Sequence, residues 1–132
     1  MPSITLQAEP ENVMVARRFV DDALAGVDVD RHLAALLVTE LVSNVVTHAS
    51  TDFEVVVAVS DPVRIEVHDG VAVTEAFRDL VANPPRQVDP GAHGGRGWVL
   101  VATLATRFGL IDRGSAGKAV WIELPRDPER LR

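Results

Sequence analysis

The sequence predicts a two-layer α+β domain in which helices cover one face of a mixed, largely antiparallel sheet. A length of 132 residues suits one domain, and 47% hydrophobic with 24% charged residues is typical of a globular protein. Hydrophobic periodicity gives the order strand, helix, helix, strand, strand, loop, helix, strand, strand. A single layer of helices on such a sheet would bury the apolar faces of both. We therefore expect residues 1–132 to form one domain.

The first third of the chain predicts one strand and two helices. Alternation around residues 4–6 indicates a short strand, and apolar positions recurring at three and four predict a helix over 13–24. Gly26 is placed to end that helix. Asp30 is a suitable N-cap for a second helix over 31–49.

The middle of the chain predicts an antiparallel strand pair. Residues 53–59 are β-branched and apolar, and 63–67 alternate with polar neighbours, so the second strand has one solvated face. The Asp61-Pro62 turn between them favours antiparallel pairing.

The remaining segments surround a long Gly- and Pro-rich stretch. Residues 70–96 form a lid-like loop with at most a short helix near 74–81, and loops of this length are usually functional or disordered. A third helix follows over 97–105, then strands over 108–112 and 119–124. The charged residues after 125 predict a frayed tail.

Composition excludes several kinds of function. The net charge is −6, which argues against a nucleic-acid partner bound through a basic face. The absence of cysteine excludes a disulfide scaffold and a thiolate metal site, and leaves the cytoplasm as the default compartment. Glu40, Asn44 and His48 interrupt the most apolar stretch, so no membrane association is expected.

An unusual polar stripe follows the second predicted helix. Glu40, Asn44 and His48 are spaced by four and line one ridge of an otherwise apolar helix. A solvated face would carry several charges, whereas this stripe suits a polar cavity. A carboxylate one turn from an amide oxygen can supply a base and a Mg²⁺ ligand, which fits nucleotide binding. An ordinary amphipathic helix explains the same spacing.

Three other motifs each allow a functional and a structural interpretation. Asp69-Gly70 follows a strand and fits either a ligand contact or a plain turn. The run from His93 to Gly97 precedes a helix, so its backbone N–H groups suit a phosphate, although a flexible hinge has the same composition. Lys118, the one lysine of the chain, suits a phosphate or a partner, or protects an edge strand.

Taken in order, four segments resemble the motifs of the GHKL ATPases, which have the Bergerat fold. The segments are Glu40-Leu-Val-Ser-Asn44-Val-Val-Thr-His48-Ala (N box), Ile65-Glu-Val-His-Asp69-Gly (G1 box), Gly94-Gly-Arg-Gly97-Trp-Val-Leu-Val (G2 box) and Gly117-Lys-Ala-Val-Trp-Ile-Glu-Leu-Pro125 (closing strand). The last two resemble most closely the anti-sigma-factor serine kinases, often called RsbW-like or SpoIIAB-like.

The resemblance implies a role for each matching residue. Glu40 would be the general base, Asn44 the Mg²⁺ ligand, and Asp69 the acceptor for the adenine amine of ATP. The other implied nucleotide contacts are His48, Gly70, Gly95, Arg96 (a candidate for the γ-phosphate), Gly97 and Lys118. In the family's pattern a glycine stands at the position of Val71, and a threonine that holds a water at the adenine stands at that of Ala119.

Two functions therefore stand side by side. The first is an ATP-dependent serine/threonine kinase that phosphorylates an anti-anti-sigma protein of the STAS-domain type and sequesters a sigma factor. The resemblance also implies a homodimer. The second is a catalytically weak or inactive module that regulates a partner by binding alone, which Val71 and Ala119 favour.

Overall fold

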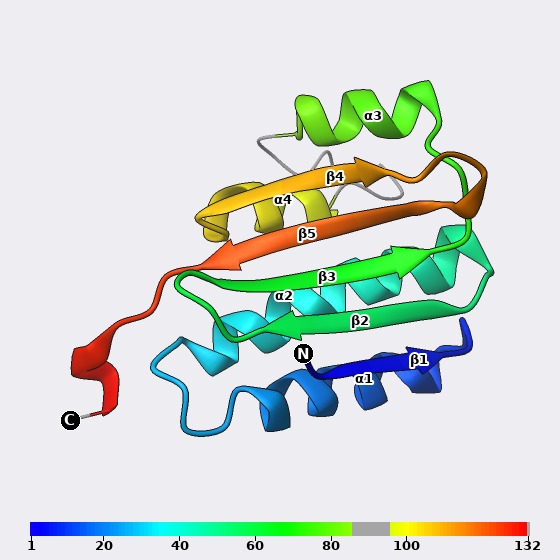
Figure 1. Ribbon diagram of the computed structural model, residues 1–132. Coiled ribbons are helices and arrows are strands. Elements are labelled where there is room, and N and C mark those ends of the chain that lie inside the picture. The colour runs from blue at the N-terminus through cyan, green and yellow to red at the C-terminus, as the bar shows by residue number, and fades with distance from the viewer. Residues whose placement is uncertain (86–95, 132) are drawn as a thin grey trace.

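Five strands form one antiparallel sheet in the computed structural model, which describes residues 1–85 and 96–131. They are β1 (Ser3–Leu6), β2 (Phe53–Ala58), β3 (Val63–Asp69), β4 (Arg107–Asp112) and β5 (Lys118–Leu124). The strand order is β1-β2-β3-β5-β4, and each neighbouring pair runs antiparallel (Figure 1). The last strand of the chain thus lies inside the sheet, between β3 and β4.

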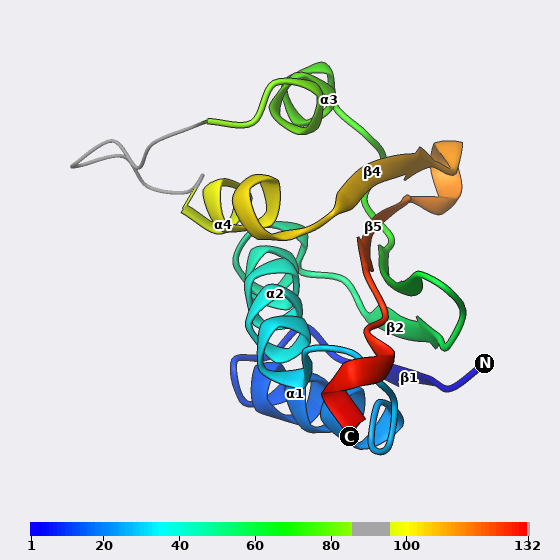
Figure 2. The ribbon, with the colours of Figure 1, turned by 90° about the vertical axis from the view of Figure 1, so that its left-hand side faces the viewer.

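The main helices cover one face of this sheet. They are α1 (Glu11–Ala23), α2 (Arg31–Asn44) and α4 (Arg96–Leu104), and Figure 2 shows them on one side of the strands. The fourth, α3 (Glu75–Ala82), lies beside the edge strand β4. The predicted two-layer α+β architecture is confirmed.

Alternation along the strands defines the core. Residues at every second position of β2 and β3 are fully or almost fully buried, namely Phe53, Val55, Val57, Val63, Ile65 and Val67. They pack in one cluster with the buried residues of α2, among them Leu37, Val38, Leu41 and Val42. The intervening residues of β3 are half-buried on the opposite face, as the alternation predicts.

The second helix begins as predicted and ends in a different geometry. The Asp30 carboxylate accepts the Leu33 N–H at 3.0 Å and caps the helix. The α-helix ends at Asn44, and Val45–Ala49 forms one turn of π-helix. Glu40 and Asn44 therefore share a regular α-helical ridge, whereas His48 belongs to the wider turn. Single π-turns of this kind often occur at functional sites.

One helical stretch among the described residues, Arg31–Ala49, is long and apolar enough to cross a membrane by length and composition. It lies against the sheet, and α2 contributes five of its residues to the core cluster: Ala34, Leu37, Val38, Leu41 and Val42. Core helices of globular proteins commonly meet the same criterion, so the stretch is explained by packing.

The C-terminal segment, which the sequence predicts to be frayed, is bound to Asp28 through Arg126 and Asp127. Arg126 donates from Nε to Asp28 Oδ1 at 2.5 Å, and the Asp127 N–H donates to the Asp28 carbonyl at 2.7 Å. A short 3₁₀ turn, Pro128–Leu131, follows. The prediction of a free tail is wrong because the buried carboxylate of Asp28 binds the arginine across 98 residues of sequence.

Candidate nucleotide site

A cavity of about 570 Å³ lies between the end of α2 and the ends of β3 and β5. That volume is in the range of small-molecule sites. Four predicted site residues line it: Asn44, His48, Asp69 and Lys118. Most of the wall is apolar: Leu41, Val45, Ala49, Val67, Val71, Ala72, Ala76, Phe77, Leu80, Trp98 and Val120. A few polar groups in an apolar wall are the usual means of orienting a ligand.

The sheet end of the cavity carries a buried ion pair. Asp69 ends β3, Lys118 begins β5, and the strand register places the two directly opposite each other. Lys118 Nζ donates to Asp69 Oδ1 at 3.0 Å and lies 3.3 Å from the Val71 carbonyl oxygen. The Val71 N–H donates to the same Asp69 oxygen at 2.8 Å. The loop after β3 is thus folded back on Asp69.

The close approach of β5 to Asp69 requires glycine at position 117. Gly117 has φ +116°, and a Cβ added there would lie 2.0 Å from the Asp69 carbonyl oxygen. Asp69 and Lys118 could not stand opposite each other in this register with a side chain at that point. Beside them, the Gly70 N–H donates to Thr51 Oγ1 at 2.9 Å, which ties this end of β3 to the loop before β2.

The helix end of the site brings together the two principal predicted groups. Glu40 and Asn44 lie one turn apart on α2, and the first turn of α4 packs against both. A Cβ on Gly97 would lie 3.0 Å from Glu40 Oε2 and 3.4 Å from Asn44 Nδ2. Glu40 is half-buried and is not among the residues that line the cavity, whereas Asn44 is. Glycine at position 97 therefore lets the α4 backbone reach the polar ridge of α2.

The other predicted contacts divide into three cases. Gly70 adjoins the cavity without lining it. Arg96 is the first residue of α4, and its side chain lies outside what the structure describes. Gly95, with most of the glycine run and part of the lid-like loop, lies outside the described residues.

Two sequence-based interpretations of β5 are wrong. Lys118 does not protect an edge strand, because β5 lies between β3 and β4. Ala119 does not face the cavity: successive side chains alternate across a strand, and Lys118 is the one that lines the cavity. Ala119 is fully buried and pairs with His68 and Ile111. The residue opposite Asp69 is therefore the cationic Lys118, and the replacement of a threonine by Ala119 removes no hydroxyl from the cavity.

Aromatic residues of the cavity wall were not predicted as part of the site. Phe77 of α3 and Trp98 of α4 meet edge to face, with ring centroids 5.8 Å apart, and both line the cavity. In the sequence each reads as an apolar position of an amphipathic helix. Only the packing of α3 and α4 around the same hollow identifies them, so no local signal distinguishes them from core residues.

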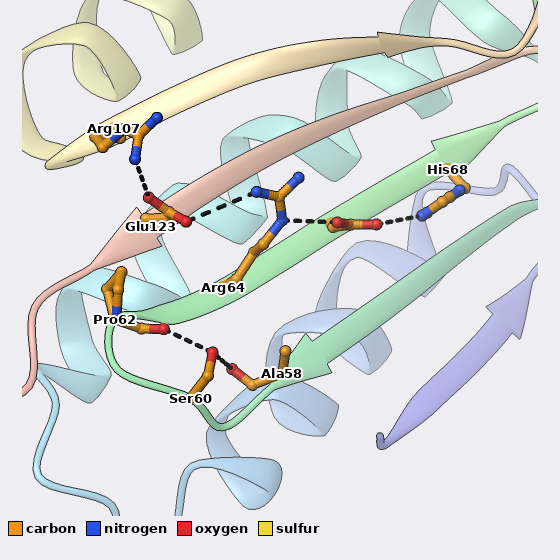
Figure 3. Close-up of polar contacts among 8 residues, drawn as sticks. Ala58, Ser60, Pro62, Arg64, His68, Arg107 and Glu123 are labelled. Atoms are coloured by element: carbon orange, nitrogen blue, oxygen red, sulfur yellow. Dashed lines mark hydrogen bonds and ion pairs between the residues drawn. The ribbon is translucent and has the colours of Figure 1, made fainter.

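The outer face of the sheet carries a separate charge network. Glu66 accepts from Arg64 Nε at 2.7 Å and from His68 Nε2 at 2.8 Å, while Glu123 pairs with Arg64 and Arg107 (Figure 3). Burial acts to raise the pKa of the Glu66 carboxyl, but its partners Arg64 and His68 outweigh burial and leave that pKa below its usual value. These groups face away from the cavity.

The donor set fits Mg²⁺ held jointly by protein and phosphates. Among residues 1–85 and 96–131 no three His, Cys, Asp or Glu side chains gather in a group able to hold a metal. Asn44 lines the cavity and its side chain carries an amide oxygen, and the Glu40 carboxylate lies one helical turn away on α2. Mg²⁺ commonly takes one or two protein oxygens and fills its remaining positions with water and phosphate.

Comparisons with known proteins agree with this architecture. The family model of the histidine kinase-like ATPase domain matches residues 6–124. No curated protein matches the chain. The solved structure of the RsbU and RsbW domains of Rv1364c from Mycobacterium tuberculosis is similar, with a TM-score of 0.60 and 14% identity. That match covers 96% of this chain, which spans 33% of the mycobacterial chain.

A second solved structure is similar over its whole length. The catalytic domain of the histidine kinase ThkA has a TM-score of 0.58 and 14% identity, and the match covers 98% of this chain and 99% of that one. At such identity the two structures establish the fold, and the family model establishes the membership. The chain belongs to the histidine kinase-like ATPase domain family, the GHKL group with the Bergerat fold.

Proposed function

We propose that this nucleotide-binding domain takes MgATP in the cavity and transfers its γ-phosphoryl group to a serine or threonine of a partner protein. The observation that carries the proposal is that Asn44, from the end of α2, and Asp69, from the end of β3, line one cavity, with Glu40 beside the first turn of α4. The adenine would lie at the Asp69 end. The phosphates would lie toward Asn44, where the α4 N-terminus favours negative charge.

Each residue then has a defined task. Asn44 supplies an oxygen ligand to Mg²⁺ on the phosphates. Glu40 accepts the proton of the attacking hydroxyl while the new oxygen–phosphorus bond forms and ADP leaves. The chain's own contribution is positioning and charge, as is general in phosphoryl transfer.

The partner classes come from the resemblance to the anti-sigma-factor serine kinases. The substrate would be an anti-anti-sigma protein with a STAS domain, and the protein sequestered in its absence would be a sigma factor. A homodimer and a cytoplasmic location belong to the same proposal. The similarity in fold to the mycobacterial structure, which contains an RsbW domain, supports this direction.

A phosphotransfer assay tests the kinase. Labelled MgATP, the protein and STAS-domain proteins of its own genome are mixed, and label on the partner is followed. Glu40→Ala should keep nucleotide affinity and lose transfer by roughly 100-fold or more. Asn44→Ala should lose Mg²⁺-dependent affinity. Glu54→Ala, a carboxylate on β2 and outside the cavity wall, is the matched control. Equal transfer by Glu40→Ala and the wild type would remove Glu40 as base.

A binding-only regulator is the second candidate. The observation that favours it is that Asp69 already holds the Lys118 ammonium at 3.0 Å, so a nucleotide must share or displace that contact. Calorimetry with ATP and ADP separates the candidates. No heat with either nucleotide, together with tight binding of a regulatory partner, would favour this second function.

A further inference from the structure

The one lysine of the chain is buried at the adenine end of the proposed site. Lys118 and Asp69 side chains are 9% and 5% exposed, and both line the cavity. The ammonium also lies 4.9 Å from the Phe77 ring centroid, within range of a cation–π contact. The Lys118 ammonium is therefore held in the cavity wall by Asp69 of β3, the Val71 carbonyl of the following loop and the Phe77 ring of α3.

The ion pair has unused hydrogen-bonding capacity. An ammonium has three donors, and two of them are engaged by Asp69 Oδ1 and the Val71 carbonyl. On the Asp69 carboxylate, Oδ1 takes both hydrogen bonds, and Oδ2 accepts none from the residues that the structure describes. One donor and one acceptor thus stand side by side in a cavity whose wall is mostly apolar.

That pair has the chemical pattern that complements one purine edge. Adenine presents the N6 amine, a donor, next to N1, an acceptor. A 6-oxopurine presents the reverse, an O6 acceptor next to an N1–H donor. In one binding pose, Asp69 and Lys118 therefore match adenine at both positions and oppose a 6-oxopurine at both.

We propose that Lys118 is a specificity-determining residue that donates to N1 of the adenine while Asp69 accepts from the N6 amine. This inference rests on the proposed nucleotide site. A buried site that hydrogen-bonds its ligand discriminates strongly against analogues that lack the matching atom, because its own polar group is left unpaired. Asp69 alone would read N6 and be indifferent to N1. The contact to N1 is the part that Lys118 adds.

Nucleotide analogues isolate this contact. 1-Deaza-ATP keeps the N6 amine and replaces N1 with a C–H group, and ITP carries the 6-oxo pattern. The wild type should bind 1-deaza-ATP roughly 10- to 100-fold more weakly than ATP in calorimetry, and ITP at least as weakly. Lys118→Met should bind ATP less tightly and distinguish ATP from 1-deaza-ATP by less than about 3-fold.

The matched control removes a positive charge elsewhere on the sheet. Arg107 lies on β4 with its side chain 72% exposed, beside Glu123 on the outer face. Arg107→Met should keep the full discrimination of the wild type. Equal affinity of the wild type for ATP and 1-deaza-ATP would overturn the proposal.

A spectroscopic measurement on the wild type tests the contact between Lys118 and the adenine N1 even if Lys118→Met does not fold. Because Lys118 is the sole lysine, ¹⁵N,¹³C-lysine labelling yields a single Nζ resonance. ATP should shift that resonance, and saturating 1-deaza-ATP should leave it nearer the free position. ATP that binds without moving the Nζ resonance overturns the role of Lys118 and leaves the ATP site standing. Failure of every nucleotide to bind overturns the proposed function, and this assignment with it.

Discussion

Gly117→Ala tests whether β5 comes as close to the end of β3 as the site requires. The added Cβ would lie 2.0 Å from the Asp69 carbonyl oxygen and 2.8 Å from the Gly70 Cα, at φ +116°. Restoring a separation of 3.0 Å from that oxygen would require the two backbones to part by about 1 Å. The displaced segment includes Lys118, so stability and nucleotide affinity should fall together.

Two costs set the expected loss of stability. The backbone region that Gly117 occupies (φ +116°, ψ −144°) is close to one reserved for glycine, and an L side chain there costs roughly 1–3 kcal/mol. Overpacking against a fixed backbone costs roughly a further 1–3 kcal/mol. The free energy of unfolding should therefore fall by about 2–6 kcal/mol in total.

The matched control is Gly114→Ala in the same hairpin. Gly114 has φ +62°, and nothing lies within 4 Å of its added Cβ, so only the conformational cost of roughly 1–2 kcal/mol applies. Urea unfolding followed by tryptophan fluorescence measures both variants, and calorimetry measures their affinity for ATP. An equal loss of stability in the two variants would refute the close approach at Gly117.

Three further predictions concern the sheet and its loops. Because the pKa of Glu66 is lowered on folding, its charged form stabilises the fold above the usual value of 4.5, and that stabilisation is lost as the pH falls through the lowered pKa. Glu66→Gln should thus unfold more easily at pH 7, by less than about 1 kcal/mol, and match the wild type in strong acid; a constant difference would contradict this. Gly109→Ala places a Cβ 2.6 Å from Cζ2 of Trp121, so tryptophan emission should shift and stability fall by roughly 1–3 kcal/mol in urea unfolding. Thr51→Val removes the acceptor of the Gly70 N–H and should cost about 0.5–1.5 kcal/mol, with faster exchange of that amide proton.

Local patterns determined most of the fold. β-Branched and apolar composition predicted β2, period-two alternation predicted β3, and the Asp30 cap predicted the start of α2. All three signals act between residues near in sequence. The ridge of Glu40 and Asn44 was also readable, since one helical turn separates the two. The anchored tail was not, because the Arg126 contact to Asp28 depends on residues far apart in the chain.

Tertiary structure alone decided which groups meet in the cavity. The sequence indicated a polar ridge, an aspartate after a strand and a lone lysine. It did not determine whether the lysine binds a phosphate, contacts a partner or protects a sheet edge. Insertion of β5 between β3 and β4 set Lys118 opposite Asp69, and turned Ala119 to the other face. Strand order depends on long-range pairing across 49 residues, and no local propensity encodes it.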